Sequence, residues 1–241
     1  MLPLKDMNPT RRFPVLTYAI IIINVLVFLW EFNLSPAQLE AALTSLAVVP
    51  ARVSADPFSL DSILSVIRSM FFHAGWSHLL GNMLYLYLFG DNVEDRMGRI
   101  VYLVLYFGSG FAATVAQVAI DPTSTIVQLG ASGAIAGVLG SYLILFPGVR
   151  VKGIVPLRSI SLWADWPAWL VLGLWFLVQF FNGAASLGVQ TSTGGVAFFA
   201  HIGGFVFGLI LTQLVMLFYP QPPIPQRQEM LYQRARRNPA F

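Results

Sequence analysis

Six long apolar stretches distinguish this chain from an ordinary soluble protein. A membrane-spanning helix needs about 20 apolar residues, and shorter runs are tolerated where a helix end lines a wet cavity. Charged residues make up only 10% of the chain, against about 25% in a typical soluble domain. The sequence therefore predicts an all-α membrane protein, a bundle of six transmembrane helices. The stretches are Val15–Phe32, Gly75–Gly90, Ile100–Ile120, Ser132–Phe146, Trp166–Phe181 and Val196–Tyr219.

Lysine and arginine are distributed unevenly over the connecting segments. If the N-terminus is cytoplasmic, twelve of the 14 Lys and Arg residues lie on that side, and only Arg52 and Arg68 lie on the other. Positively charged residues favour the cytoplasmic face of a membrane. We therefore expect both termini to be cytoplasmic. The predicted divisions are a cytoplasmic N-terminal segment (residues 1–14), a membrane domain (15–219) and a disordered basic tail (220–241).

The long outer segment between the first two stretches contains one amphipathic pattern. Apolar residues recur at helical spacing at Leu60, Ile63, Leu64, Ile67 and Phe71, with polar residues off that face. This pattern predicts a helix that lies in the membrane interface.

Four polar side chains fall at one predicted depth in the membrane. Ser132 begins the fourth stretch, His201 lies near the outer end of the sixth, and His78 and Asn82 are four residues apart in the second. Residues at that spacing share one face of a helix. Titratable groups inside a membrane are functional candidates by default. Ser132 is expected roughly 8 Å below the outer edge of a hydrocarbon core of about 30 Å.

Small residues flank both the serine and the sixth-stretch histidine. Gly133 follows Ser132, and Gly204 and Gly208 form a G-x-x-x-G motif one turn after His201. Such residues let two helices approach closely. That approach would bring Ser132 and His201 within hydrogen-bond reach, as a Ser–His nucleophile requires.

The second stretch could complete the chemistry. The Asn82 amide, a His78 ring N–H and the Ser132 backbone N–H are candidate donors to the oxyanion of an acyl-transfer intermediate. No carboxylate is placed to orient His201, so the prediction is a dyad rather than a triad. The chain has no cysteine, which excludes thiolate metal sites and a cysteine nucleophile. We expect no metal, no cofactor and no nucleic-acid partner; the oligomeric state is left open.

Each of these features also has a simpler explanation. Close packing of small-residue helices produces a G-x-S-G motif without chemistry, and a histidine beside G-x-x-x-G often only bonds a neighbouring helix. Two other functions therefore stay open: a scaffold that binds membrane helices without cutting them, and a small transporter. We interpret the six stretches as free of Asp, Glu, Lys and Arg inside the membrane spans, and we find no convincing internal repeat. Both observations count against a transporter.

The polar motifs together resemble the rhomboid family of intramembrane serine proteases, from about residue 68 to residue 208. The resemblance rests on His73, His78 and Asn82 in the segment FFHAGWSHLLGNM, on Glu94 and Arg96, on Gly130 to Gly133 around Ser132, and on His201 with Gly204 and Gly208. It implies cleavage of transmembrane protein substrates near the outer boundary of the lipid bilayer, without metal or cofactor. It also implies structural roles for His73, Glu94 and Arg96. Six spans without a seventh are similar to the simple bacterial or archaeal type, which would place the chain in the plasma membrane.

One position departs from the family pattern. Members often carry an aromatic residue four positions after the serine, stacked on the catalytic imidazole, and here that residue is Ala136. Phe198, Phe199 or Phe205 are candidates to hold the His201 ring instead. Substrate is expected to reach the site laterally, past the fifth stretch and the outer loop near residues 183–195.

Overall fold

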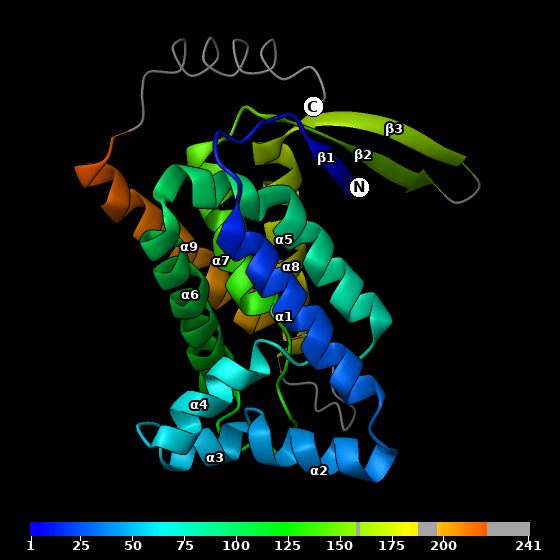
Figure 1. The fold of residues 1–241 in the computed structure, drawn as a ribbon, viewed down its shortest axis with the longest axis vertical. Helices are drawn as coiled ribbons and strands as arrows, with labels where there is room; N and C mark the ends of the chain where they lie inside the picture. Colours follow the sequence, from blue (N-terminus) through cyan, green and yellow to red (C-terminus); the bar gives the residue numbers. More distant parts are fainter. Residues whose placement is uncertain (158–159, 188–196, 221–241) are drawn as a thin grey trace.

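The structure is a computed structural model that describes residues 1–157, 160–187 and 197–220. It is a helical bundle with a small sheet at one end and three short helices at the other (Figure 1). The bundle helices are α1 (Val15–Phe32), α5 (Trp76–Met97), α6 (Arg99–Ile120), α7 (Ser132–Leu145), α8 (Ala168–Ser186) and α9 (Phe198–Phe218). The short helices are α2 (Pro36–Leu46), α3 (Pro50–Ala55) and α4 (Leu60–Ser69). The strands are β1 (Leu2–Asp6), β2 (Arg150–Leu157) and β3 (Ile160–Pro167).

The sheet is absent from the sequence-based prediction, so the expectation of an all-α protein is wrong. Its strands are antiparallel in the order β1-β2-β3. Two residues assigned to the fifth apolar stretch, Trp166 and Pro167, belong to β3. Proline favours an extended conformation in the residue before it and is tolerated only at the start of a helix. Helix α8 therefore begins at Ala168.

Each of the six apolar stretches overlaps one bundle helix, which confirms a mostly helical membrane protein. Four of these helices, α1, α6, α8 and α9, are long and apolar enough to cross a membrane. The apolar helix α7 has only 14 residues, or about 21 Å of helix. The last two turns of α5 carry Asp91, Glu94, Asp95 and Arg96. Two of the expected spans therefore fall short by length or composition, and six crossings with cytoplasmic termini stay a prediction.

Helix α7 lies at the centre of the bundle. It packs against α5, α6, α8 and α9, and every residue from Gly133 to Tyr142 is buried. A helix that is apolar on all sides is stable only when it is surrounded. This placement puts Ser132, its first residue, in the interior at the end opposite the sheet (Figure 1).

The turn between α5 and α6 ties two other helices to the sheet end of the bundle. The Glu94 carboxylate accepts hydrogen bonds from the backbone N–H groups of Leu16 and Thr17, at 3.0 and 2.8 Å. It thereby caps the start of α1, where N–H groups lack helical partners. Arg96 donates to the carbonyl oxygens of Tyr219 and Pro220, at 3.0 and 3.3 Å, beyond the end of α9.

The expected amphipathic helix is present as α4, and two further helices, α2 and α3, accompany it. The small polar residues Ser62 and Ser65 of α4 are buried, whereas Leu60 and Ile63 are exposed. The apolar face of α4 therefore points away from the protein. This agrees with an interfacial helix whose apolar face contacts lipid.

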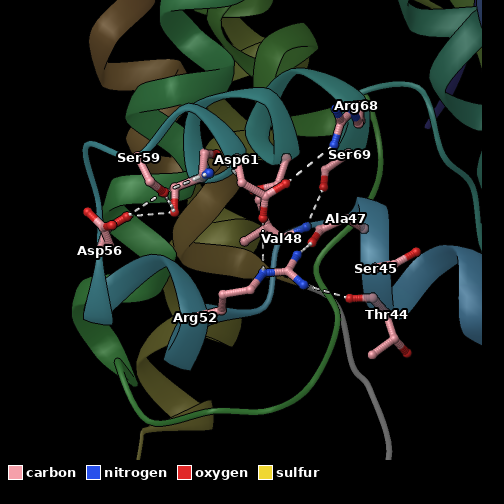
Figure 2. Close-up of polar contacts among 12 residues, drawn as sticks. Thr44, Ser45, Ala47, Val48, Arg52, Asp56, Ser59, Asp61, Arg68 and Ser69 are labelled. Carbon is pink, nitrogen blue, oxygen red and sulfur yellow. Dashed lines mark hydrogen bonds and ion pairs between the residues drawn. The ribbon is translucent and has the colours of Figure 1, made fainter.

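Polar contacts hold this outer layer together (Figure 2). The Arg52 guanidinium donates to the carbonyl oxygens of Thr44 and Ala47, at 2.8 and 2.5 Å, and pairs with the Asp61 carboxylate at 3.8 Å. The Ser69 hydroxyl accepts the Val48 N–H at 2.7 Å. These bonds fix the position of Ser69, which contacts the loop in front of α7.

Candidate active site

Ser132 and His201 are in direct contact. The Ser132 hydroxyl lies 2.8 Å from His201 Nε2, across the interface of α7 and α9. Both residues are partly buried. A hydroxyl that donates to an imidazole nitrogen at this distance can lose its proton to that nitrogen as it attacks an electrophile. The arrangement is therefore chemically competent for nucleophilic catalysis.

Glycines bring the two helices together closely enough for this contact. A Cβ on Gly204 would overlap the carbonyl oxygen of Gly133, and one on Gly208 would overlap that of Gly137. The two backbones are thus in van der Waals contact one and two turns below the Ser–His pair. Gly133 and Gly204 have the role in packing that the sequence predicts.

The loop before α7 places His78 beside the serine. Gly130 has a φ of +124°, in the region that favours glycine. A Cβ there would lie 2.7 Å from the His78 ring and 3.7 Å from Ser132 Oγ, so both groups border this one residue. The Gly130 N–H donates to the Ser69 carbonyl oxygen at 2.8 Å, which connects the loop to the outer layer.

His78 Nδ1 accepts the Ala74 N–H at 3.5 Å. In the neutral ring this leaves the proton on Nε2, the nitrogen that lies beside Gly130. His78 can therefore donate a hydrogen bond toward the space in front of Ser132.

Asn82 carries a buried donor without a partner. Its side chain is buried one turn after His78, and Nδ2 donates to no hydrogen-bond acceptor among the described residues. Buried polar groups are nearly always bonded, and an exception often marks a site that awaits a ligand or water. An oxyanion would supply the missing acceptor.

The start of α7 adds a third donor. Ser132 is the first residue of the helix, and the first backbone bond into it runs from the Ile135 N–H to the Ala131 carbonyl. The Ser132 N–H therefore precedes the helical hydrogen-bond ladder. It also lies at the positive end of the helix dipole, which favours a negative charge nearby.

This serine-centred site lies in a recognised domain: the Rhomboid domain family matches residues 61–218. The chain belongs to the rhomboid family. It is 31% identical over 139 residues to "Putative rhomboid protease YdcA" of Bacillus subtilis (strain 168), covering 56% of this chain and 64% of that protein. It is 30% identical over 156 residues to "Rhomboid protein 1, mitochondrial" of Saccharomyces cerevisiae, covering 63% of this chain and 41% of that protein.

A chloroplastic relative, "Rhomboid-like protein 11" of Arabidopsis thaliana, is 30% identical over 159 residues, 63% of this chain and 52% of that protein. The chain thus spans about two fifths to two thirds of the length of these rhomboid relatives. Because they include bacterial, mitochondrial and chloroplastic proteins, the simple bacterial or archaeal subtype is not confirmed. The chain is a multi-pass membrane protein of this family.

The rhomboid site has a third histidine, His73, in its wall. His73 is buried, and its ring meets the His78 ring edge to face at 5.1 Å. Its backbone N–H donates to the Glu31 carboxylate at 3.2 Å, and its Nδ1 lies 3.2 Å from the Phe71 carbonyl oxygen. These contacts fit the structural role that the family resemblance implies for His73.

Glu31 corrects one sequence-based interpretation. It lies in the last turn of α1, and its side chain is only 3% exposed. A carboxylate therefore does lie within the first apolar stretch, close to its outer end. Its carboxylate has a structural partner, because it accepts the His73 N–H. Among the described residues, no group of three or more acidic or histidine side chains could hold a metal ion.

Two side chains of α8 that the sequence analysis did not select contact the His201 ring. Gln179 Oε1 lies 2.8 Å from His201 Nδ1. The Trp175 ring lies one turn away on α8, 5.8 Å from the imidazole centroid. Phe205, one of the three expected partners of the imidazole, instead packs on Trp175 and Phe176. Trp175 of α8 thus lies beside the His201 imidazole, where family members often have an aromatic residue at the position of Ala136.

The sequence did contain a signal for Gln179. It is the only amide, acid or base between Trp166 and Phe181. A single amide in an apolar span commonly bonds another helix. The pattern alone, however, does not say which helix. The other residue near this region, Gln117 of α6, accepts the Ala200 N–H at 3.2 Å and steadies the first turn of α9.

Proposed function

We propose that this rhomboid protein is an intramembrane serine endopeptidase in which Ser132 is the nucleophile and His201 the general base. The 2.8 Å contact between Ser132 Oγ and His201 Nε2 is the observation that carries the proposal. His201 takes the hydroxyl proton as Oγ forms a bond to the scissile carbonyl carbon. The imidazolium then protonates the leaving amine, the C–N bond breaks, and an acyl-enzyme forms. Water repeats the sequence and releases the acid product.

The oxyanion of the tetrahedral intermediate is stabilised by three donors. They are the Ser132 N–H, the Asn82 side-chain amide and the His78 ring N–H. The unpartnered, buried Nδ2 of Asn82 supports this role. A donor that is already fixed in a low-dielectric site needs no reorganisation as charge develops, which makes such donors effective.

The substrates are transmembrane proteins cut near the outer membrane boundary. Ser132 lies at the end of the bundle that carries α2, α3 and α4, away from the sheet (Figure 1). With cytoplasmic termini and six spans, that end faces outward, in a bacterial or archaeal plasma membrane. The substrate helix must unwind locally, because helical backbone groups in lipid are already bonded to one another. The resemblance to the rhomboid family further implies small residues at the cleaved bond and helix-weakening residues beyond it.

The first test is covalent labelling of detergent-purified protein with a fluorophosphonate, which reacts with activated serines without any knowledge of the substrate. The wild type is expected to label, and labelling should fall by at least about a hundredfold in both Ser132→Ala and His201→Ala. Ser109→Ala is a matched control, since Ser109 is a buried serine of the neighbouring helix α6. It should label like the wild type.

The labelling experiment also separates the alternatives. Well-folded wild-type protein that stays unlabelled in detergent and in lipid would contradict an activated serine. Binding of a transmembrane helix that survives Ser132→Ala, without any cleavage by the wild type, would then indicate a scaffold. Solute flux in liposomes would indicate a transporter.

A further inference from the structure

Gln179 meets the one nitrogen of the His201 ring that Ser132 does not use. Its Oε1 lies 2.8 Å from Nδ1, while Nε2 lies 2.8 Å from the Ser132 hydroxyl. The two contacts come from opposite sides of the ring and from different helices, α8 and α7. No carboxylate bonds to either ring nitrogen among the residues in the described ranges.

The chemistry of the ring makes these two bonds dependent on each other. A neutral imidazole carries one proton, on Nδ1 or on Nε2. If an acceptor holds the proton on Nδ1, the lone pair of Nε2 is free to accept from serine. If the proton moves to Nε2, the ring can only donate to the serine oxygen and cannot act as a base. In serine hydrolases this choice is fixed by a group on the far nitrogen, and a wrong tautomer abolishes most of the rate.

Helix α8 presents Gln179 and Trp175 on one face toward His201. The residues are four apart, so their side chains are stacked along the helix. The Trp175 ring lies 5.8 Å from the imidazole and 6.1 Å from Phe205, which is 2% exposed. Packing of Trp175 against this buried residue fixes the rotation of α8 and thereby keeps the Gln179 amide directed at Nδ1.

A neutral amide suits the surroundings of this site. A buried carboxylate without a full set of donors is costly in an apolar environment, whereas an amide oxygen accepts the same hydrogen bond without a net charge. The amide stabilises an imidazolium less than a carboxylate would. It still determines which ring nitrogen carries the proton.

We propose that Gln179 is the positioning residue of the catalytic pair, holding His201 in the Nδ1–H tautomer. The inference deepens the proposed function and rests on it, since it assigns the group that orients the proposed base. It replaces a two-residue arrangement with a Ser132–His201–Gln179 chain of hydrogen bonds, supplied by three helices. Because Gln179 lies on α8, the orientation of the His201 ring depends on the position of that helix in the bundle.

The test uses Gln179→Met, which keeps the length of the side chain but has no strong acceptor, and Gln179→Glu, which keeps an acceptor. Histidine is selectively labelled with ¹⁵N in the full chain. The chain has only three histidines, so the signals of His201 are identified by their loss in His201→Ala. The wild type and Gln179→Glu should show a protonated Nδ1 and an unprotonated Nε2. Gln179→Met should show a mixture of both tautomers.

Labelling by a fluorophosphonate gives the second measurement. Its rate is expected to fall about tenfold or more in Gln179→Met and to recover in Gln179→Glu. The control is Leu177→Met, a substitution at an exposed position of the same helix, which should change neither the tautomer nor the rate. An unchanged His201 tautomer in Gln179→Met would overturn the inference, even if the labelling rate falls.

The two proposals can fail separately. A wild-type protein that never labels would overturn the protease assignment, while the NMR spectra would still decide which nitrogen Gln179 holds protonated. A wild type that labels, together with a Gln179→Met variant of wild-type rate and spectrum, would leave the Ser132–His201 pair intact and remove Gln179 from it.

Discussion

Helices α7 and α8 both pack against α9, but α7 contacts it through backbone and α8 through side chains. At the α7–α9 interface, a Cβ on Gly140, Gly204 or Gly208 would overlap a backbone carbonyl of the other helix. At the α8–α9 interface, the contacts are made by rings such as Phe176 on Phe205, with centroids 4.6 Å apart. A Cβ on Gly173 of α8 would meet nothing within 4 Å.

The difference assigns separate roles to the two interfaces. Backbone atoms cannot rotate out of the way, so α7 and α9 hold the Ser132–His201 distance fixed. Side chains can change rotamer. On the outward face of α8, Val178 and Phe181 are more than half exposed and therefore pack against little of the protein. The nucleophile and base thus lie on two helices joined by backbone contacts, while the group that orients the base lies on a helix joined to α9 by side-chain contacts.

The largest expected effect comes from adding one methyl group to the rigid interface. Gly204→Ala should destabilise the protein by about 2–3 kcal/mol, because the new Cβ overlaps the Gly133 carbonyl oxygen. Gly173→Ala makes the same change on α8 and should be neutral or slightly stabilising, since alanine is the better helix former. Thermal unfolding in detergent measures both. Equal effects of the two substitutions would contradict the contrast between the interfaces.

A smaller effect is expected from opening the side-chain interface. Trp175→Ala removes the ring beside His201 and Phe205, which should lower stability by about 1 kcal/mol. The rate of fluorophosphonate labelling should fall several-fold, because Gln179 is then less firmly directed at the imidazole. Trp169→Ala is the control, since Trp169 is on the same helix and 54% exposed. If Trp175→Ala costs more stability than Gly204→Ala, the interfaces have been ranked wrongly.

The smallest effect concerns pH and the sheet that precedes α8. Burial, together with the neighbouring Asp91 carboxylate, raises the pKa of Asp6 well above its usual range, against the opposing hydrogen bond from Tyr142 and the charge of Lys5. The raised pKa means that the folded protein binds this proton more tightly than the unfolded chain does. The contribution to stability is therefore complete below the usual aspartate range near pH 3.8 and is lost as pH rises through the higher folded pKa.

Asp6→Asn should remove this pH dependence while keeping an acceptor for the Tyr142 hydroxyl, which lies 2.7 Å from Asp6 Oδ2. Hydrogen exchange of the wild type should accelerate in β1 and β2 as pH rises, after correction for the intrinsic exchange rate, and should not accelerate in α7. The expected change in melting temperature is a few degrees at most, at about 2–4 °C per kcal/mol for a chain of this size. Faster exchange in α7 would show that the two parts of the molecule are not independent.

The sequence was sufficient for the six bundle helices, for α4 and for the contact between Ser132 and His201, for a physical reason. Apolar runs must become helices in a membrane, and rows of glycine on two such helices leave few ways to pack other than the one that joins Ser132 to His201. His78 and Asn82 follow because they share one helical face. All these inferences depend on residues near one another in the sequence or on a strong packing rule.

The sheet and the role of Gln179 could not be predicted in the same way. β1 pairs with β2 across about 150 residues, as in the pairing of Leu2 with Ile154, and no local pattern identifies such a partner. The alternation of Leu162, Ala164 and Trp166 in β3 is typical of a strand, but it merges into the apolar run of α8. Which face Gln179 presents depends on the rotation of α8, and that is set by the packing of Trp175 and Phe176.

The junction of β3 and α8 makes the helix a lever. Strand β3 ends at Pro167 and α8 begins at the next residue, where the Ala168 and Trp169 N–H groups donate to the carbonyl oxygens of Val149 and Pro147, at 2.8 and 3.0 Å. These bonds anchor the first residues of α8 at the sheet end of the bundle. Gln179 lies eleven residues along the arm, about 17 Å away at the rise of an α-helix, so a tilt of about 5° displaces it by roughly 1.5 Å. That distance is enough to break its bond to His201. A second helix that packs against the outer end of α8 would therefore displace Gln179 with less force than one that packs close to the sheet.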